Sequence, residues 1–246
     1  MEKAIRYDET LVGYFDIYGY SSFVKSPLDE CLSKIDKLIA KVQQDGKAQI
    51  LDWRLKHWLL SDSIIITPDL DSHPLDEYSI DFFIGICSVL LHRGISTGFP
   101  LRGAIGGGYI YKSDEVLLSS ALVDAHDYEQ VQKWWGAVIT PSALRIIHKY
   151  VPASAFGQPE GSPNAYPNIR KGIVPWKEDK ALDIKKQEAY YYIVPPQRAD
   201  TNTDWTTYLP DYLDLDKAQA MIKNSRCLYG HSSYSRDFAD GRAESP

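Results

Sequence analysis

The stretch "WLLSDSIIIT", residues 58–67, places one carboxylate, Asp62, between two short apolar runs. The apolar run before Ser61-Asp62 and the β-branched run after it predict two strands, at 50–60 and 63–67, joined by a tight turn. A charge in an otherwise apolar hairpin costs several kcal/mol unless another group compensates it. This hairpin therefore raises the question of which group lies beside Asp62.

The segments around the hairpin alternate between strand and helix patterns. Residues 11–17, "LVGYFDI", are aromatic and β-branched and predict a strand that carries Asp16 near its end, before a turn at "GYSS". Apolar residues spaced by 3.6 predict a helix on each side of the hairpin. The remaining predicted elements of this half are a helix from Ser26-Pro27 to Gly46, a helix over 80–91 ended by Gly94 and Gly98, and a glycine-rich strand, "PLRGAIGGGYIY", at 100–111.

The order strand, helix, strand, strand, helix, strand predicts an α+β fold with a ferredoxin-like βαββαβ core. Two helices then cover one face of an antiparallel sheet, and right-handed crossovers place the first and third strands side by side. The end of the first strand consequently meets the hairpin at 61–62. We therefore expect Asp16 and Asp62 to be neighbours in space.

Further elements follow this core without a clear linker. They are a helix at 120–132, a strand at 134–140, a helix from Pro141 to about Tyr150, a strand at 189–195 and a helix at 214–223, with 152–189 left unassigned. The tail from 227 is rich in Ser, Gly and Asp and is expected to be flexible. We therefore predict one domain, residues 1–226, with extra C-terminal strands and helices, and a flexible tail, 227–246.

Composition limits the classes of function. The chain of 246 residues is 44% apolar and has a formal charge of -6, which argues against a nucleic-acid or anionic-membrane binder. Cys31 and Cys87 lie in apolar periodic segments and are expected to be core thiols in a reducing compartment. The longest apolar run, 82–91, is too short to cross a bilayer, and the N-terminus lacks an apolar leader. We expect a cytoplasmic protein without a membrane partner.

Two carboxylates at one edge of a sheet repel each other, and cations between them remove that repulsion. Oxygen ligands suit Mg²⁺ or Mn²⁺, and phosphoryl chemistry commonly uses two such ions about 3.5–4 Å apart. The alternative is that Asp16 caps its turn and Asp62 is an ordinary hairpin residue. Their joint placement at these two points of this topology favours the metal site.

The motifs around these residues resemble a known family. "YFDIYGYSSF" (14–23) is similar to the first metal motif of class III adenylate and guanylate cyclases, and "LLSDSIIIT" resembles their second, with Ser-Asp in place of Gly-Asp. "LRGAIGGGYIY", "GAVITPSALRII" and "RKGIVPWK…AYYYIVP" resemble the strands and helix that follow, over roughly residues 10–195. Within the class, "SDSI" and "ALVDAHDYE" look most like the bacterial Pycsar antiphage pyrimidine cyclases.

The resemblance implies a site and a reaction. Asp16 and Asp62 would ligate two Mn²⁺ or Mg²⁺ ions with the carbonyl of Ile17, and Gly19, Tyr20 and Ser21 would lie beneath the phosphates. The ribose 3′ oxygen would attack the α-phosphate and expel pyrophosphate. The family also implies a homodimer with active sites at the subunit interface, and a separate effector protein that senses the cyclic nucleotide.

The sequence departs from the purine cyclases in two places. Trp58 stands where they carry a base-reading lysine, four residues before the hairpin aspartate; on one strand the two side chains would share a face, about 13 Å apart. Trp58 is thus placed to pack on the base, or it is a core or dimer-interface aromatic. Val123 and Asp127 replace the family's Asn and transition-state Arg. Arg102 is the candidate to supply that charge, with a structural arginine as the alternative.

The resulting hypothesis is an active cyclase that makes cyclic UMP from UTP, with cyclic CMP from CTP as the nearest competitor and a cyclic purine nucleotide as a further alternative. A catalytically degenerate nucleotide-binding module of the same fold is the alternative from another class. A palm-type nucleotidyltransferase is disfavoured by the acidic charge. The six histidines show no ligand spacing, and "GAIGGG" lacks the spacing and lysine of a P-loop, so its glycines are expected to permit close backbone packing or a bulge.

Overall fold

A central mixed sheet organises the residues that the structure, a computed structural model, describes: 4–49, 55–113, 115–156, 166, 169–177, 188–193, 218–221 and 223–225. Its order within these residues is β2-β3-β1-β4-β6-β8-β7, with β5 paired to β4. β4 and β6 run parallel, and the other named pairs are antiparallel. The strands are β1 (Ile5–Ile17), β2 (Leu55–Leu60), β3 (Ser63–Pro68), β4 (Leu101–Lys112), β5 (Leu117–Ser119), β6 (Gly136–Ile139), β7 (Ile169–Gly172) and β8 (Tyr190–Ile193).

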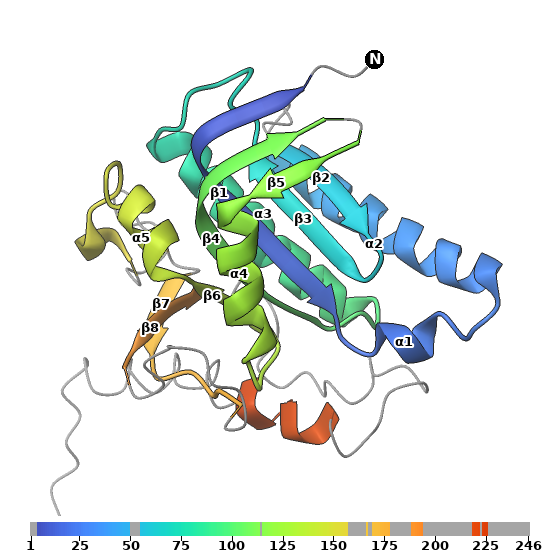
Figure 1. Cartoon of the computed structure of the whole chain (residues 1–246). Coiled ribbons are helices and arrows are strands. Elements are labelled where there is room, and N and C mark those ends of the chain that lie inside the picture. The colour runs from blue at the N-terminus through green and yellow to red at the C-terminus, as the bar shows by residue number, and fades with distance from the viewer. Residues whose placement is uncertain are drawn as a thin grey trace, which may run out of the picture.

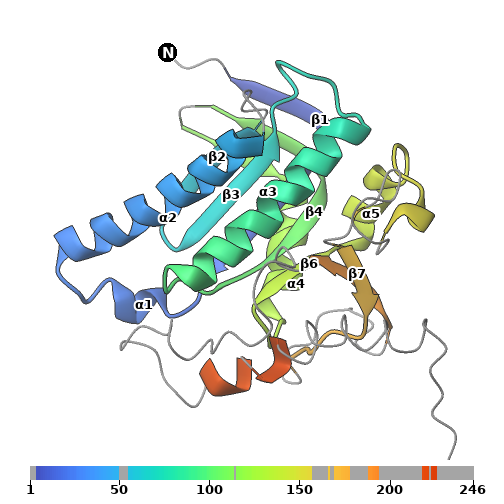
Figure 2. The same ribbon diagram turned by 180° about the vertical axis from the view of Figure 1, so that it is seen from behind.

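Helices cover both faces of this sheet. The long helices α2 and α3 lie side by side on one face (Figure 2), and α4 lies on the other, across β1 and β4 (Figure 1). The order β1-α2-β2-β3-α3-β4, with β1 next to β3, confirms the predicted ferredoxin-like α+β core. The helices are α1 (Tyr20–Phe23), α2 (Leu28–Gln49), α3 (Glu77–Ser96), α4 (Ser120–Gln130) and α5 (Pro141–Ile147), with a 3₁₀ turn at Ala153–Ala155.

The alternation along β1 separates an apolar face from a polar one. Phe15 and Ile17 are buried in the main core under α2 and α3. Tyr14 and Asp16 point to the opposite face, because successive side chains of a strand alternate. The face under α4 therefore receives the polar residues of β1 while the face under α2 and α3 stays apolar.

α3 ends just before Gly98, which is left-handed (φ 79°), as predicted. The helix-ending roles predicted for Gly46 and Gly94 are wrong, and each miss has a physical reason. α2 continues through Gly46 to Gln49, since a single glycine costs a helix only about 1 kcal/mol. α3 passes through Gly94 to Ser96; a Cβ at Gly94 would lie 2.5 Å from the carbonyl oxygen of Phe99, so this glycine permits a close approach of the backbone. α3 begins at the capping box of Asp76 and Ser79.

A glycine in β4 brings α4 directly onto the sheet. A Cβ at Gly106 would lie 2.0 Å from the carbonyl oxygen of Ala121 and 2.8 Å from the backbone nitrogen of Ala125, both in α4. This confirms the expectation that the glycines of "GAIGGG" permit close packing. Helix α4 is thus held against the strand that carries Arg102 with no side chain between the two backbones.

The part of the chain after β4 adds to the sheet as expected, with two strands, β5 and β7, that were not predicted. The predicted strands at 134–140 and 189–195 contain β6 and β8, and the unassigned segment 152–189 contains β7. Residues 218–221 and 223–225 are helical and pack on Trp135. The rest of the helix predicted at 214–223 and the tail 227–246 lie outside the described residues.

Helix α3 is long and apolar enough, by length and composition, to cross a membrane, unlike the shorter run considered from the sequence. The structure nevertheless buries 67% of its apolar window. Cys87 of α3 and Cys31 of α2 are buried free thiols, as expected for core cysteines. In this structure α3 is a helix of the protein core.

Candidate active site

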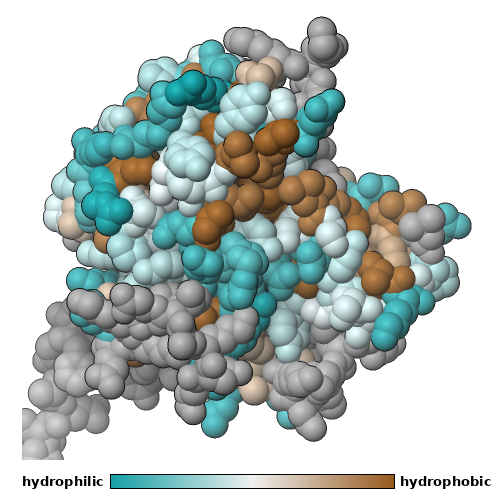
Figure 3. Space-filling model, in the orientation of Figure 1, coloured by the Kyte–Doolittle hydropathy of each residue, from teal (hydrophilic) through white to brown (hydrophobic). Residues whose placement is uncertain are grey.

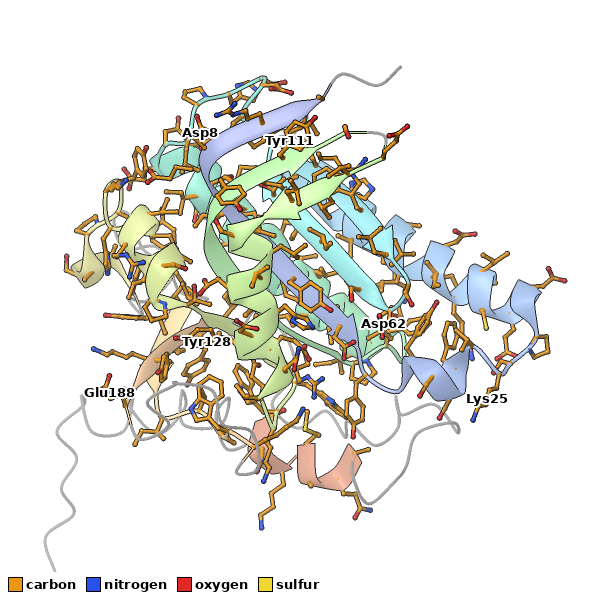
Figure 4. The ribbon with its side chains drawn as sticks, in the orientation of Figure 1. Asp8, Lys25, Asp62, Tyr111, Tyr128 and Glu188 are labelled. Atoms are coloured by element: carbon orange, nitrogen blue, oxygen red, sulfur yellow. The ribbon has the colours of Figure 1, made fainter. Side chains whose placement is uncertain are left out.

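The end of β1 meets the β2–β3 hairpin, as the topology predicts. Asp16 pairs with Ser63 in the register of β1 and β3. The backbone N–H of Ile17 donates to the carbonyl oxygen of Asp62 at 2.8 Å. Figure 4 shows Asp62 in the turn at this end of the sheet, near the start of α1. Asp16 and Asp62 are therefore neighbours, although 45 residues separate them in the chain.

The turn that carries Asp62 is tied to β1 through a side-chain network. Ser61 takes a left-handed conformation (φ 56°), which closes the turn. The hydroxyl of Ser63 donates to the phenol oxygen of Tyr14 at 2.7 Å and lies 3.4 Å from Oδ1 of Asp62. Burial raises the pKa of the Tyr14 phenol. Tyr14 thus stays a neutral hydrogen-bonding group that positions the hairpin.

Asp16 lies in a strongly acidic and partly desolvated place. Desolvation is the main cause that raises the pKa of its carboxyl to about 6, followed by repulsion from Glu129 and, more weakly, Asp62. Arg102 and Lys177 act in the opposite direction. The charge of Asp16 is therefore undercompensated, which is the electrostatic condition under which a cation binds.

Arg102 links Asp16 to a residue that the sequence did not single out. It is the direct partner of Asp16 in the register of β1 and β4, and its Nη2 donates to Oδ2 of Asp16 at 3.3 Å. Its Nε donates to Oε1 of Glu129 in α4. The Glu129 side chain is 4% exposed and that of Arg102 is 13% exposed, so this ion pair is largely buried.

The end of α4 is fixed to the same strand. The side-chain amide of Gln132 donates to the carbonyl oxygen of Gly103, next to Arg102, and its backbone N–H donates to the carbonyl oxygen of Glu129 at 3.1 Å. At the start of α4, the Ser119 hydroxyl caps the backbone N–H of Leu122. Glu129 is thus positioned from both ends of its helix.

A second cation reaches the site from the C-terminal half. The backbone N–H of Lys177 donates to the carbonyl oxygen of Val131 at 2.6 Å, and its ammonium group donates to the carbonyl oxygen of Gln130 at the end of α4. Its positive charge lowers the pKa of Asp16. Lys177 therefore belongs to the electrostatic surroundings of the carboxylate pair.

The segment after β1 turns sharply. Gly19 takes a left-handed conformation (φ 82°) and begins the short helix α1, which contains Tyr20 and Ser21. The backbone N–H of Tyr18 donates to the carbonyl oxygen of Pro100 at 3.0 Å. The structure thus places Gly19, Tyr20 and Ser21 directly after the carboxylate strand. Their contact with phosphate stays a prediction.

The geometry assumed for Trp58 is wrong in one respect. β2 ends at Leu60, so Asp62 lies in the turn and not on the same strand as Trp58. Trp58 pairs with Ile65, which pairs with Tyr14, so the three form a row across the sheet. Trp58 is half-buried beside these residues and also lines an apolar cavity of about 70 Å³ at the sheet edge.

Helix α4 carries Val123 and Asp127, which the sequence pattern aligns with the Asn and Arg of purine cyclases. Val123 is 60% exposed, and Asp127 is partly exposed one turn later. His126 contacts the edge of the Tyr14 ring, with centroids 5.4 Å apart. Val123 and Asp127 are neither an amide nor a cation, and the role expected of Arg102 stays a prediction.

The residues present fit a hard divalent cation. Among the described residues, no group of three or more His, Cys, Asp or Glu side chains is arranged to hold a metal ion. The donors expected from the sequence, the Asp16 and Asp62 carboxylates and the Ile17 carbonyl, would therefore leave the remaining ligand positions of an ion to other groups. Oxygen-only donors with excess negative charge suit Mg²⁺ or Mn²⁺, which keep several ligand positions for water and substrate phosphates. The fit is to ions bound together with an anionic substrate.

The sequence contained a signal for Glu129 but none for Lys177. Glu129 continues the stripe of Ala121 and Ala125 at a spacing of four residues, and all three are buried. A carboxylate on the buried stripe of a helix indicates a buried partner. Lys177 follows an irregular segment whose docking depends on tertiary contacts, so no local pattern marks it.

Comparison with known proteins gives similarities of structure only. No protein-family model matches the chain, and no curated protein matches it in sequence. The chain is similar to the catalytic core of a rhodopsin-guanylyl cyclase with converted specificity bound to ATPαS (TM-score 0.49, 13% identity, 79% of this chain and 99% of that one). It is also similar to the guanylate cyclase domain of RhGC from Catenaria anguillulae in complex with GTP (TM-score 0.49, 11% identity, 78% of this chain and 100% of that one). A third similar structure is the adenylyl cyclase CyaB from P. aeruginosa (TM-score 0.43, 14% identity, 80% of this chain and 98% of that one).

Proposed function

We propose that the chain is a metal-dependent nucleotidyl cyclase, which converts a nucleoside triphosphate to its 3′,5′-cyclic monophosphate and pyrophosphate. The observation that carries the proposal is the meeting of Asp16 and Asp62 at one edge of the sheet. The turn at Gly19 follows directly in the chain, and Arg102 and Lys177 act on the same carboxylate. This combination of acids and cations suits a metal-bound triphosphate.

The chain's own residues supply binding and positioning. Asp16, Asp62 and the Ile17 carbonyl would hold divalent cations, which when bound neutralise phosphate charge and lower the pKa of the attacking 3′ hydroxyl. Arg102 and Lys177 are placed to attract the negative charge of the triphosphate, and Arg102 to stabilise charge that develops during transfer. Gly19, Tyr20 and Ser21 are assigned to the turn beneath the phosphates.

For the substrate we favour UTP, with CTP as the nearest competitor. The support is the aromatic Trp58 at the base-reading position and the resemblance of "SDSI" and "ALVDAHDYE" to the Pycsar pyrimidine cyclases. A cyclic purine nucleotide is the alternative, since the similar structures are named guanylyl and adenylyl cyclases. On this proposal the product is a cytoplasmic antiphage signal read by a separate effector protein.

The proposal includes a homodimer with sites at its interface. A broad hydrophobic surface supports it, which Figure 3 shows on the side of the molecule that carries β5 and α4. Exposed apolar side chains in these two elements are Leu118 of β5 and Val123 of α4. Light scattering should give twice the monomer mass for the wild type and the monomer mass for Leu118→Glu. An unchanged mass in the variant would contradict this face as the interface.

The test of function is to incubate the purified protein with each of the four ribonucleoside triphosphates and Mn²⁺ and to identify products by mass spectrometry. Cyclic UMP is the expected main product. Asp16→Ala and Asp62→Ala should abolish it, whereas Asp8→Ala should not, because Asp8 is an exposed acid at the far end of the same strand. If the wild type forms no cyclic nucleotide from any of the four substrates, the proposal that the chain is a cyclase is wrong.

A nucleotide-binding module without catalysis is the second candidate. The observation that favours it is the replacement of the family's Asn and Arg by Val123 and Asp127 on α4. It predicts saturable binding of a nucleotide, measured by calorimetry, with no cyclic product. The two candidates therefore separate in one pair of measurements on the same preparation.

A further inference from the structure

Arg102 lies between two acids that differ in their surroundings. Its Nη2 contacts Asp16, whose side chain is 19% exposed and stands at the edge of the sheet. Its Nε contacts Glu129, whose side chain is 4% exposed and is enclosed beneath α4. The two contacts use different nitrogens of one guanidinium group, so either can persist without the other.

Cation binding at Asp16 changes one of these contacts. A carboxylate oxygen that turns to a divalent ion gives up much of its attraction for a neighbouring guanidinium, because the two cations repel each other. Arg102 must then keep another carboxylate or move away. Glu129 is the acid that contacts it, and the anchoring of α4 through Gln132 and Gly103 keeps that acid in place.

We propose that Glu129 is a positioning residue, which retains Arg102 when Asp16 engages a divalent cation and so leaves the Nη2 edge of the guanidinium facing the phosphates of the substrate. The inference rests on the proposed function for the identity of the substrate. Its first part, that Glu129 decides whether Arg102 or a cation holds Asp16, concerns this chain alone. That part can be measured without any catalysis.

The first measurement is Mn²⁺ binding without nucleotide, followed by electron paramagnetic resonance of the free ion. In Glu129→Gln, Asp16 becomes the remaining carboxylate partner of Arg102, so Arg102 competes more strongly with Mn²⁺. We expect about tenfold weaker Mn²⁺ binding, as for other groups that support a metal ligand. In Arg102→Met the competitor is absent, and Mn²⁺ should bind at least as tightly as to the wild type.

A double-mutant cycle separates positioning from a general change of charge. If Glu129 acts through Arg102, adding Glu129→Gln to Arg102→Met should change Mn²⁺ affinity and kcat by less than about twofold. A purely electrostatic effect of the lost charge would appear equally in both backgrounds, and that result would overturn the proposal. Glu9→Gln is the matched control, because Glu9 is exposed and pairs with Lys149 on another part of the surface.

Kinetics complete the test on the nucleotide that the wild type converts. Glu129→Gln should lower kcat about 10–100-fold with a smaller change in KM, because the guanidinium is lost mainly from the transition state.

If that variant does not fold in a thermal scan, Arg102→Lys takes its place, since one ammonium group cannot span both acids as the guanidinium does. Equal metal binding and kcat in wild type and Arg102→Lys would overturn the proposal. A wild type that is inactive but shows the Mn²⁺ pattern refutes the cyclase and leaves the role of Glu129 standing.

Discussion

The two faces of the sheet are built from alternate residues of the same strands, yet the two faces have different roles. Phe15 and Ile17 are 0% and 2% exposed in the core beneath α2 and α3. Asp16, between them, lies on the face toward α4. There it contacts Arg102, which also contacts Glu129 of α4. The first face stabilises the fold through apolar burial, and the second holds charges that the fold tolerates at a cost. Stability and chemistry can therefore be changed separately at neighbouring positions.

The largest effects should come from substituting adjacent residues of β1. Phe15→Ala removes a fully buried ring and should lower the free energy of unfolding by about 3–5 kcal/mol. Asp16→Ala should leave the fold intact and lower kcat about a thousandfold or more, equivalent to about 4 kcal/mol. Urea denaturation and product formation, measured on both variants, check the pair. A loss of folding in both would break the division between the faces.

The charged face should also show its cost in the dependence of stability on pH. The pKa of Asp16 is about 6 in the folded chain against 3.8 for the free carboxyl, so the folded state binds this proton more tightly than the unfolded state does. Ionised Asp16 therefore destabilises the fold above pH 6, and the penalty disappears as the pH falls toward 4. Asp16→Asn should raise the free energy of unfolding by on the order of 2 kcal/mol at pH 7–8.

That comparison is made by urea denaturation in EDTA between pH 4 and 8. The gain in Asp16→Asn should shrink below pH 6 and vanish near pH 4. When EDTA is replaced by Mn²⁺, the stability advantage of Asp16→Asn should also shrink, because a bound cation compensates the charge of Asp16 in the wild type. A gain that is constant across this pH range would show that Asp16 titrates as an ordinary exposed acid.

Substituting Trp58 tests whether the polar face of the sheet also contacts the base of the proposed nucleotide substrate. Trp58 shares a row with Tyr14 and Ile65 but lies on β2, away from the carboxylates. If it stacks on the base, Trp58→Ala should raise KM for the proposed pyrimidine substrate about tenfold or relax the choice of base. Trp58→Phe is the control that keeps an aromatic ring. Unchanged kinetics in the alanine variant would assign Trp58 to packing alone.

The smallest predicted effect concerns Gly19, in the turn that follows β1. Gly19 has a φ of 82°, which costs a residue with a Cβ about 1 kcal/mol. Gly19→Ala should lower stability by that amount and raise KM for the triphosphate by a few-fold, with kcat less affected. Gly85→Ala is a suitable control, because the space around its Cβ position is open. Equal kinetics in both variants would remove Gly19 from the phosphate site.

The sequence predicts more of the fold than of the site. Alternation and helical periodicity predict the βαββαβ order, and right-handed crossovers then bring Asp16 to Asp62. β5, β7 and the N-terminal extension of β1 are missed. β5 is too short for a pattern, and the polar residues of the other two follow none, so pairing partners decide the structure. Lys177 and the true path between Trp58 and Asp62 depend on tertiary packing and turn geometry, which no local pattern contains.

The contact of Gly106 with α4 has a consequence for large-scale mutagenesis. Every side chain at this position would displace the helix that carries Glu129, since a Cβ alone would lie 2.0 Å from the Ala121 carbonyl oxygen. A screen that scores only growth or product would find that Gly106 tolerates substitution as poorly as a metal-binding residue does, although glycine carries no reactive group. A parallel score of protein abundance would distinguish the two, because Gly106 variants should lose abundance and Asp16 variants should keep it.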